Sequence, residues 1–179
     1  METYLVFGAD GPQGRAVVEG LLDVGVPRGL VIGTVRHTHG RECAELSRAG
    51  VCVVRANLRR PKSIAAALDA CAPTRVYFTT DFFSKLCGTV EREVATGLRV
   101  VEACEFAESV EMICYGSTCD CDRAPSRVAH FRAKLALERL LARGAKDFCV
   151  VRSAQLLDAL ETRPPRGGRP GEVRFLTHP

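Results

Sequence analysis

Six short apolar runs, spaced along most of the chain, constrain the fold more than any other feature of the sequence. They are rich in Val, Ile, Phe and Tyr, and they lack alternating polar positions. Runs of this kind are typical of strands that are covered on both faces in a parallel sheet. The predicted strands are Tyr4–Phe7, Leu30–Val35, Val51–Val54, Val76–Thr80, Met112–Tyr115 and Phe148–Val151.

Amphipathic segments between these runs predict helices. Apolar residues recur at intervals of three or four within residues 17–22, 61–71, 86–101 and 131–141. Pro61 suits a first helical position, and Gly25 and Gly144 suit positions that follow a helix C-terminus. Strands that alternate with helices predict an α/β fold, a doubly wound parallel sheet of about six strands with helices on both faces.

Composition indicates one soluble globular domain, with 46% hydrophobic and 26% charged residues. The domain is expected to span residues 1–160, because residues 161–179 are rich in Pro, Gly and Arg and predict a flexible tail. Residues 162–179 contain four arginines and one acid, so they carry +3 of the formal net charge of +4. The rest of the chain is therefore nearly neutral, and no direct nucleic-acid binding is expected.

No apolar run approaches the ~18–20 residues that span a bilayer, and Gly8 and Asp10 interrupt the first one too early for a secretory signal. The nine cysteines are odd in number and include no Cys-x-x-Cys pair, which indicates reduced thiols in a cytoplasmic or nuclear protein. Cys119 and Cys121 are closer together than metal ligands usually are, and no second pair lies nearby. No metal site and no membrane partner are predicted.

A glycine-rich turn directly follows the first predicted strand. Residues 8–14 have the spacing G-x-x-G-x-x-G and lead into the first helical stripe. Such glycines permit a tight turn, close backbone approach to a pyrophosphate, and close packing of helix on strand. Because the turn lies in the first strand–helix unit of an α/β pattern, it predicts a dinucleotide site in a Rossmann fold, the alternative being a turn that has lost its ligand. The expected ligands are Gly8, Asp10, Gly11, Pro12, Gln13 and Gly14.

The end of the second predicted strand predicts the type of dinucleotide. NAD sites usually place an acid there to hold the ribose 2′-hydroxyl, but this chain has Arg36 and no acid before Glu42. An arginine can pair with a 2′-phosphate through two N–H donors. Arg36 is therefore the predicted 2′-phosphate ligand and Arg41 a weaker second, so NADP(H) is preferred over NAD(H); the alternative is a solvated basic loop.

Several of these segments together resemble the NmrA-like family of atypical short-chain dehydrogenases/reductases. The turn Gly8-Ala9-Asp10-Gly11-Pro12-Gln13-Gly14 is similar to the family's G-A-T-G-x-Q-G, with Gln13-Gly14 as the discriminating pair. Residues 76–83 resemble the fourth strand and its aromatic turn, residues 130–134 the H-F-x-x-K helix start, and Val151-Arg152 the end of the sixth strand. The resemblance covers roughly residues 3–158. It implies that Asn57 and Leu58 contact the adenine, and that Thr79 and Thr80 also line the cofactor site.

The resemblance also bears on catalysis. Reductases of the wider superfamily use Tyr-x-x-x-Lys on a helix, where the chain has His130-x-x-x-Lys134. Lys134 is expected to keep the ribose-binding role, whereas His130 lacks the geometry and pKa of a tyrosine suited to carbonyl reduction. Ser117 could polarise a carbonyl or could instead cap its loop, and Tyr115 is expected in the core more than in a catalytic role. No residue is predicted to be catalytic; Ser117, His130 and Lys134 are weak candidates.

The expected function follows from these features and from the family. In this architecture a smaller C-terminal domain closes the substrate pocket. The residues after Ser153 are too few to form such a domain, so the substrate domain is expected to be largely missing. The sequence therefore predicts an NADP(H)-binding redox sensor or regulator that acts through a protein partner or as a homodimer, without turnover. The alternative is an NADPH-dependent reductase of a small quinone or carbonyl compound, with Lys134 and Ser117 assisting.

Overall fold

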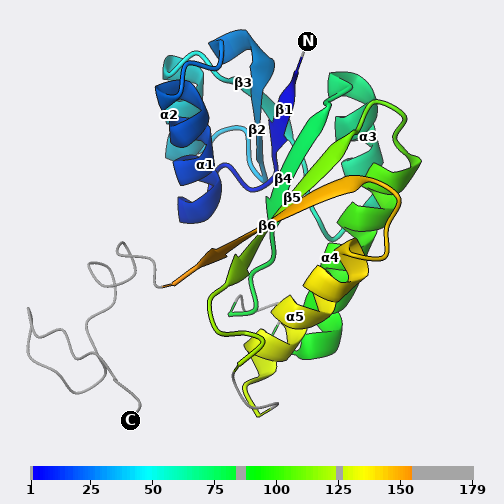
Figure 1. Ribbon diagram of the computed structural model, residues 1–179. Coiled ribbons are helices and arrows are strands. Elements are labelled where there is room, and N and C mark those ends of the chain that lie inside the picture. Colours follow the sequence, from blue (N-terminus) through cyan, green and yellow to red (C-terminus); the bar gives the residue numbers. More distant parts are fainter. Residues whose placement is uncertain (1, 84–87, 124–126, 155–179) are drawn as a thin grey trace, which may run out of the picture.

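Six parallel strands form a single sheet with helices on both faces (Figure 1). The computed structural model describes residues 2–83, 88–123 and 127–154. The predicted tail, residues 161–179, lies outside the described residues. The strands are β1 (Tyr4–Val6), β2 (Val31–Val35), β3 (Cys52–Arg55), β4 (Arg75–Thr79), β5 (Met112–Thr118) and β6 (Asp147–Ser153). The helices are α1 (Pro12–Asp23), α2 (Arg41–Arg48), α3 (Pro61–Cys71), α4 (Val90–Phe106) and α5 (Ala129–Leu141), with a short 3-10 turn at Arg28–Leu30.

The strand order β3-β2-β1-β4-β5-β6 confirms the predicted doubly wound Rossmann sheet. Strand order reverses between β1 and β4, where the chain returns to the middle of the sheet. Helices α1 and α2 cover one face, and α3, α4 and α5 cover the other (Figure 1). The carboxyl ends of β1 and β4 therefore meet at the topological switch point, the usual ligand site of such sheets.

Two hydrophobic clusters hold these layers together. The larger one lies under α3, α4 and α5 and includes Ile64, Phe78 and Leu137, none of which is exposed to solvent. The smaller one lies under α1 and α2 and includes Val18 and Leu46. The helices thus pack apolar side chains against one side or the other of the central sheet.

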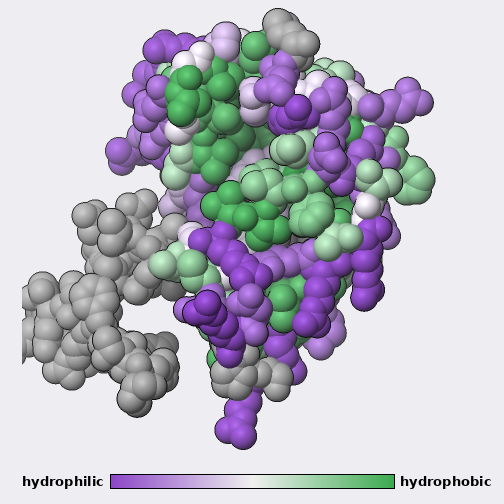
Figure 2. Space-filling model, viewed as in Figure 1, coloured by the Kyte–Doolittle hydropathy of each residue, from purple (hydrophilic) through white to green (hydrophobic). Residues whose placement is uncertain are grey.

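The sequence pattern missed one helix and misjudged two strands. Helix α2 buries only Leu46, so it lacks the stripe by which the other helices were recognised. The expectation that all strands are covered on both faces is wrong for the edge strands: most of β6 is exposed, including Phe148 and Val151. In Figure 2 apolar side chains gather over the middle of the face that β6 crosses, with hydrophilic ones around them. The start of the third stripe, at Leu86, lies outside the described residues, and α4 begins at Val90.

The helix boundaries follow local chemistry. Helix α3 begins at Pro61, as predicted, because proline has no N–H to leave unpaired there. Gly25 has φ +89 just after the end of α1, and its N–H donates to Leu22 O at 3.0 Å. Helix α5 instead ends at Leu141 with Ala142 as its C-cap, so Gly144 lies beyond the helix end.

Shortening a buried aromatic side chain should lower the stability of the protein much more than shortening an exposed side chain. Phe78 is fully buried and its ring centroid lies 4.9 Å from that of Tyr115. We expect Phe78→Ala to lower the free energy of unfolding by about 3–5 kcal/mol, because it removes buried apolar contacts and leaves a cavity. Val24 is 79% exposed, so Val24→Ala should change it by less than about 0.5 kcal/mol. Urea denaturation of both variants tests this, and similar losses would contradict the packing described here.

Candidate functional site

The turn after β1 brings backbone atoms unusually close to the start of α1. Gly8 has φ +73, a conformation that favours glycine, and Gly11 N donates to Gly8 O at 2.9 Å. A Cβ placed on Gly14 would lie 2.2 Å from the carbonyl oxygen of Gly8, closer than atoms can approach. Only glycine fits at position 14, so α1 packs directly on the turn. This is the close helix–strand packing that the third glycine of a dinucleotide turn provides.

The N-terminus of α1 is open for a ligand. Gly11 is the N-cap, Pro12 occupies the first turn, and that turn contains no acidic residue. Within the described ranges no side chain caps this helix, so its first N–H groups and the positive end of its dipole face the switch point. The Gln13 side chain extends across the sheet edge, where Nε2 donates to Ser153 Oγ of β6 at 3.3 Å. Turn, helix end and last strand therefore meet at one edge.

Arg36 lies directly after β2 and next to Asp10 of the glycine-rich turn. Its backbone N–H donates to Asp10 Oδ2 at 3.2 Å, and its Nε lies 3.7 Å from the same oxygen. The Arg36 side chain is 72% exposed, so its guanidinium remains open to solvent. The structure thus brings these two predicted ligands together. The contact between the acid of the turn and the arginine is not predicted by the sequence pattern; an acid where the family motif has threonine was the available signal.

The second residue predicted at the 2′-phosphate and the two predicted at the adenine have local partners. Arg41 lies in the first turn of α2 and pairs with Glu45 at 2.7 Å, a carboxylate that Arg15 also contacts at 2.6 Å. These hydrogen bonds lower the pKa of Glu45. Asn57 follows β3, and its Oδ1 accepts from the Arg59 N–H at 3.0 Å, which fixes the turn. Leu58 packs against the larger core cluster.

Lys134 of α5 lies in a buried network at the carboxyl ends of β4 and β5. Its Nζ donates to Thr80 O at 2.7 Å, with longer contacts of 3.2 Å to Thr80 Oγ1 and 3.3 Å to Thr79 Oγ1. It also lies 3.4 Å from both Gly116 O and Glu93 Oε1. Lys134 is 8% exposed and Glu93 of α4 is 0% exposed. The structure therefore surrounds this ammonium with protein acceptors, and a ribose contact stays a prediction.

Two hydroxyls complete this network. Thr80 Oγ1 donates to Glu93, and it lies 3.0 Å from the hydroxyl of Tyr115. Tyr115 is fully buried, and this burial raises its pKa well above the usual range. Its ring packs in the core, in line with the core alternative favoured above. Glu93 Oε2 has no hydrogen-bond partner among the described residues. The Lys134 charge is what compensates this buried carboxylate.

Ser117, at the end of β5, is held by a second cluster, which is only partly buried. Its hydroxyl donates to Glu138 of α5, and Arg152 of β6 binds the same carboxylate through Nε at 3.0 Å and Nη2 at 2.6 Å. Arg152 also pairs with Asp122 at 2.8 Å. Burial acts to raise the pKa of Glu138, but hydrogen bonds from Arg152, Ser117 and Cys121 outweigh it and lower that pKa. The serine hydroxyl thus joins strand to helix, and it also lies 3.9 Å from Cys121 Sγ in the loop that follows β5.

His130 occupies an aromatic environment at the start of α5. Its ring centroid lies 4.3 Å from that of Phe131, 5.1 Å from Phe83 and 5.9 Å from Phe82. Burial lowers the pKa of His130; the charge of Glu93 acts in the opposite direction and that of Lys134 in the same one, and the net pKa is lowered. The imidazole is therefore neutral at physiological pH.

Two carboxylates of this edge, Glu93 and Glu138, were missed by the sequence analysis. The available signal was spacing: Glu93 lies four residues before Gly97, and Glu138 four residues after Lys134, so both fall on buried helix faces. Acids at such positions need a buried cation, but the sequence does not identify its partner on another element.

Neither a metal centre nor a membrane span is found in the described part of the chain. In residues 2–83, 88–123 and 127–154, no group of three or more His, Cys, Asp or Glu side chains could hold a metal ion. Over the same ranges no helix is both long and apolar enough to cross a membrane.

The parallel sheet order and the glycine-rich turn at its switch point define a Rossmann fold of the NAD(P)-binding class. The NmrA-like family model matches residues 1–163, and the chain belongs to the NmrA-like family. No curated protein matches the chain.

Solved structures share the fold at low sequence identity. Triphenylmethane reductase of Citrobacter sp., complexed with NADP(H), is 21% identical with a TM-score of 0.73, over 87% of this chain and 50% of that one. The NADPH-dependent quinone oxidoreductase QOR2 of Escherichia coli, complexed with NADPH, is 20% identical with a TM-score of 0.72, over 92% and 55%. The WbmH enzyme of Bordetella bronchiseptica, in complex with NAD+, is 19% identical with a TM-score of 0.66, over 87% and 56%. The chain spans about half the length of these proteins.

The buried pair Lys134–Glu93 generates a stability prediction. Lys134→Met leaves the Glu93 carboxylate buried without its cation, so the free energy of unfolding should fall by about 3–5 kcal/mol. Adding Glu93→Leu should recover most of this loss, because two apolar side chains then replace the pair. The exposed pair of α2 is the control: Arg41→Ala should change the free energy of unfolding little, because solvent screens this pair. Urea denaturation measures all three, and a double variant no better than Lys134→Met would contradict the pairing.

Proposed function

We propose that this NmrA-like chain binds NADP(H) at the switch point and acts as a redox-responsive regulator through protein contacts, without turnover. The observation that carries the binding proposal is the approach of Gly14 to Gly8, which leaves no room for a side chain and exposes the N-terminus of α1. A pyrophosphate there would accept hydrogen bonds from free N–H groups and gain from the helix dipole. Two of the fold neighbours are described as complexed with NADP(H) or NADPH, and a third with NAD+, which supports a nicotinamide dinucleotide.

The preference for NADP(H) rests on Arg36. Its guanidinium is exposed beside the turn, where two N–H donors could pair with a 2′-phosphate. Asp10 acts against this preference, because its carboxylate sits on the Arg36 side and would repel a phosphate. The balance of these two charges sets the ratio of NADPH to NADH affinity.

The absence of turnover is inferred from the nicotinamide end of the site. A reductase needs a proton donor and a group that polarises the carbonyl, each directed at substrate. Here the Ser117 hydroxyl donates to Glu138, and Lys134 is bound to Thr80 and Glu93. His130 is neutral and packed among phenylalanine rings. Because these side chains are bonded to other groups of the protein, they favour a role in binding and positioning the cofactor, and not in catalysis. Bound nucleotide would then favour one conformation of the protein that a partner recognises.

A reductase of small quinones or carbonyl compounds is the second candidate. It is supported by the fold neighbours, which are described as a triphenylmethane reductase and a quinone oxidoreductase. NADPH oxidation followed at its absorbance band with a panel of quinones and aldehydes separates the two. Turnover that Lys134→Ala abolishes, with nucleotide binding retained, would overturn the regulator proposal.

Calorimetric titration with NADPH tests the binding proposal directly. We expect wild-type chain to bind and Gly14→Ala to lose at least ~tenfold in affinity, since displacing the turn needs to cost only about 1.4 kcal/mol. Gly20→Ala is the matched control in the same helix, because a Cβ there meets no atom within 4 Å. That variant should bind NADPH as wild type does and gain about 0.5–1 kcal/mol of stability. No NADPH binding by the wild-type chain would refute the proposal.

A second titration tests the role of Asp10. Asp10→Asn removes the charge facing Arg36, so NADPH affinity should rise by about two- to fivefold, or 0.5–1 kcal/mol, and NADH affinity should change less. Arg36→Ala should lower the ratio of NADPH to NADH affinity. Both effects should shrink at high salt, because the groups are exposed. Asp147→Asn, at the opposite edge of the sheet, should leave both affinities unchanged, and an unaltered ratio in both site variants would exclude this mechanism.

A further inference from the structure

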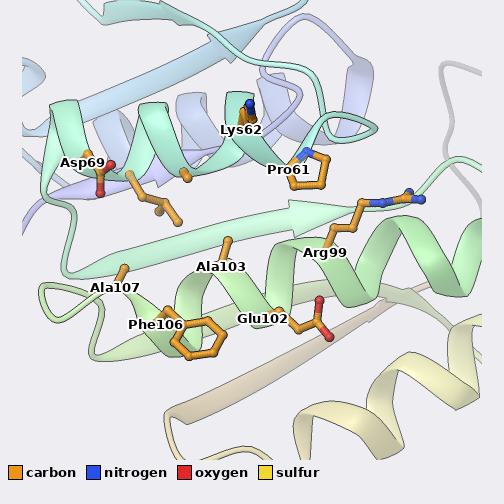
Figure 3. Close-up of a pocket in the computed structure, with 10 residues that line it drawn as sticks. Pro61, Lys62, Asp69, Arg99, Glu102, Ala103, Phe106 and Ala107 are labelled. Carbon is orange, nitrogen blue, oxygen red and sulfur yellow. The ribbon is translucent and has the colours of Figure 1, made fainter.

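Helices α3 and α4 lie side by side and form a shallow groove of about 430 Å³ away from the glycine-rich turn (Figure 3). Its floor consists of small or apolar side chains, namely Ala65, Leu68 and Ala103. Phe106, the last residue of α4, borders one end and is 88% exposed. An exposed aromatic ring beside an apolar floor forms a small apolar patch rimmed by polar residues, as interaction sites do.

The charged side chains around the groove differ in sign between its two ends. Lys62 and Arg99 lie near one end, Asp69 lies at the other, and Glu102 lies between, because both helices run the same way (Figure 3). In the part of the chain that the structure describes, none of these four side chains forms an ion pair or a hydrogen bond. The groove therefore has a positive end and a negative end whose charges are unpaired among the described residues.

We propose that the occupant of this groove is a second copy of the chain, related by a two-fold axis that runs across the groove. Such an axis reverses the direction of the groove in the partner, so α3 packs antiparallel on the α3 helix of the partner, and α4 on its α4 helix. Lys62 then faces the partner's Asp69, and Arg99 faces the end of the partner's α4 that carries Phe106. The same patch complements itself, as an isologous interface requires.

The alternative two-fold arrangement is unfavourable for the same charges. An axis along the groove would keep its direction, so the positive end of one copy would face the positive end of the other. Helix α3 would then pack on the partner's α4, so Lys62 would face the end that carries the partner's Arg99, and Asp69 would face the end that carries the partner's Phe106. The crossing axis instead places the Phe106 ring against the partner's Arg99, where the guanidinium can stack on the ring. Ala65 and Ala103 near the middle allow the helices to approach closely.

Charge reversal on single chains tests this arrangement. Sedimentation velocity of the full 179-residue chain should show a concentration-dependent dimer of the 19.4 kDa monomer. In a dimer of Lys62→Glu the two facing α3 helices carry only acids at positions 62 and 69, and in a dimer of Asp69→Lys they carry only bases there. Each variant alone should therefore dimerise at least tenfold more weakly. Mixed together, the two variants should form a heterodimer, because each acid then faces a base. The double variant K62E/D69K should restore self-association.

Controls separate the interface from general effects of charge. Arg48→Glu makes the same reversal on α2, on the other face of the sheet, and should leave dimerisation unchanged, whereas Phe106→Ser should weaken it. Circular dichroism of each variant shows that the fold is retained. A wild-type chain that stays monomeric at all concentrations overturns the proposal. So does a dimer that the reversals do not weaken, or single variants whose mixture does not associate. None of these outcomes depends on nucleotide binding.

Discussion

The arrangement of the site depends on one contact between backbone atoms, the approach of α1 to the turn after β1. Without a side chain at Gly14, the helix lies so close to the turn that a Cβ would overlap the carbonyl oxygen of Gly8. This contact fixes the direction in which the helix dipole points and the distance between the helix end and the carboxyl edge of the sheet. The position of Asp10 against Arg36, and of Gln13 against Ser153, follows from it. A larger residue at position 14 would shift all of these together.

Two buried carboxylates organise the part of the carboxyl edge of the sheet that lies at β4, β5 and β6. Glu93 and Glu138 are carboxylates on α4 and α5, and each is compensated by a cation from a different element, Lys134 and Arg152 respectively. Burying a carboxylate is unfavourable unless a cation and hydrogen bonds accompany it. These pairs therefore join helix to helix and helix to strand where the hydrophobic clusters end. They also bind the groups, Ser117 among them, that a catalytic site would direct at substrate.

Much of the fold follows from patterns within short segments, and the misses have physical causes. The six strands, the first helix and the start of α3 at Pro61 were correct because each is encoded by neighbouring residues. Helix α2 was missed because it buries one residue, so it carries almost no apolar periodicity. The exposure of β6 was not foreseen because an edge strand and a central strand have similar composition. Neighbour relations in the sheet, unlike strand identity, depend on residues far apart in the chain.

The sequence by itself determined the class of fold, the glycine-rich turn, the arginine after β2 and the membership that the NmrA-like family model confirms. These features are local, since a turn, a cap or a strand is specified by residues a few positions apart. Only the tertiary structure decided which distant charges meet. It placed Asp10 beside Arg36, paired Lys134 with Glu93 and Arg152 with Glu138, and left the charges of the α3–α4 groove without partners among the described residues. The physical reason is that electrostatic pairing depends on distance in space and on burial, and neither is written in the spacing of residues along the chain.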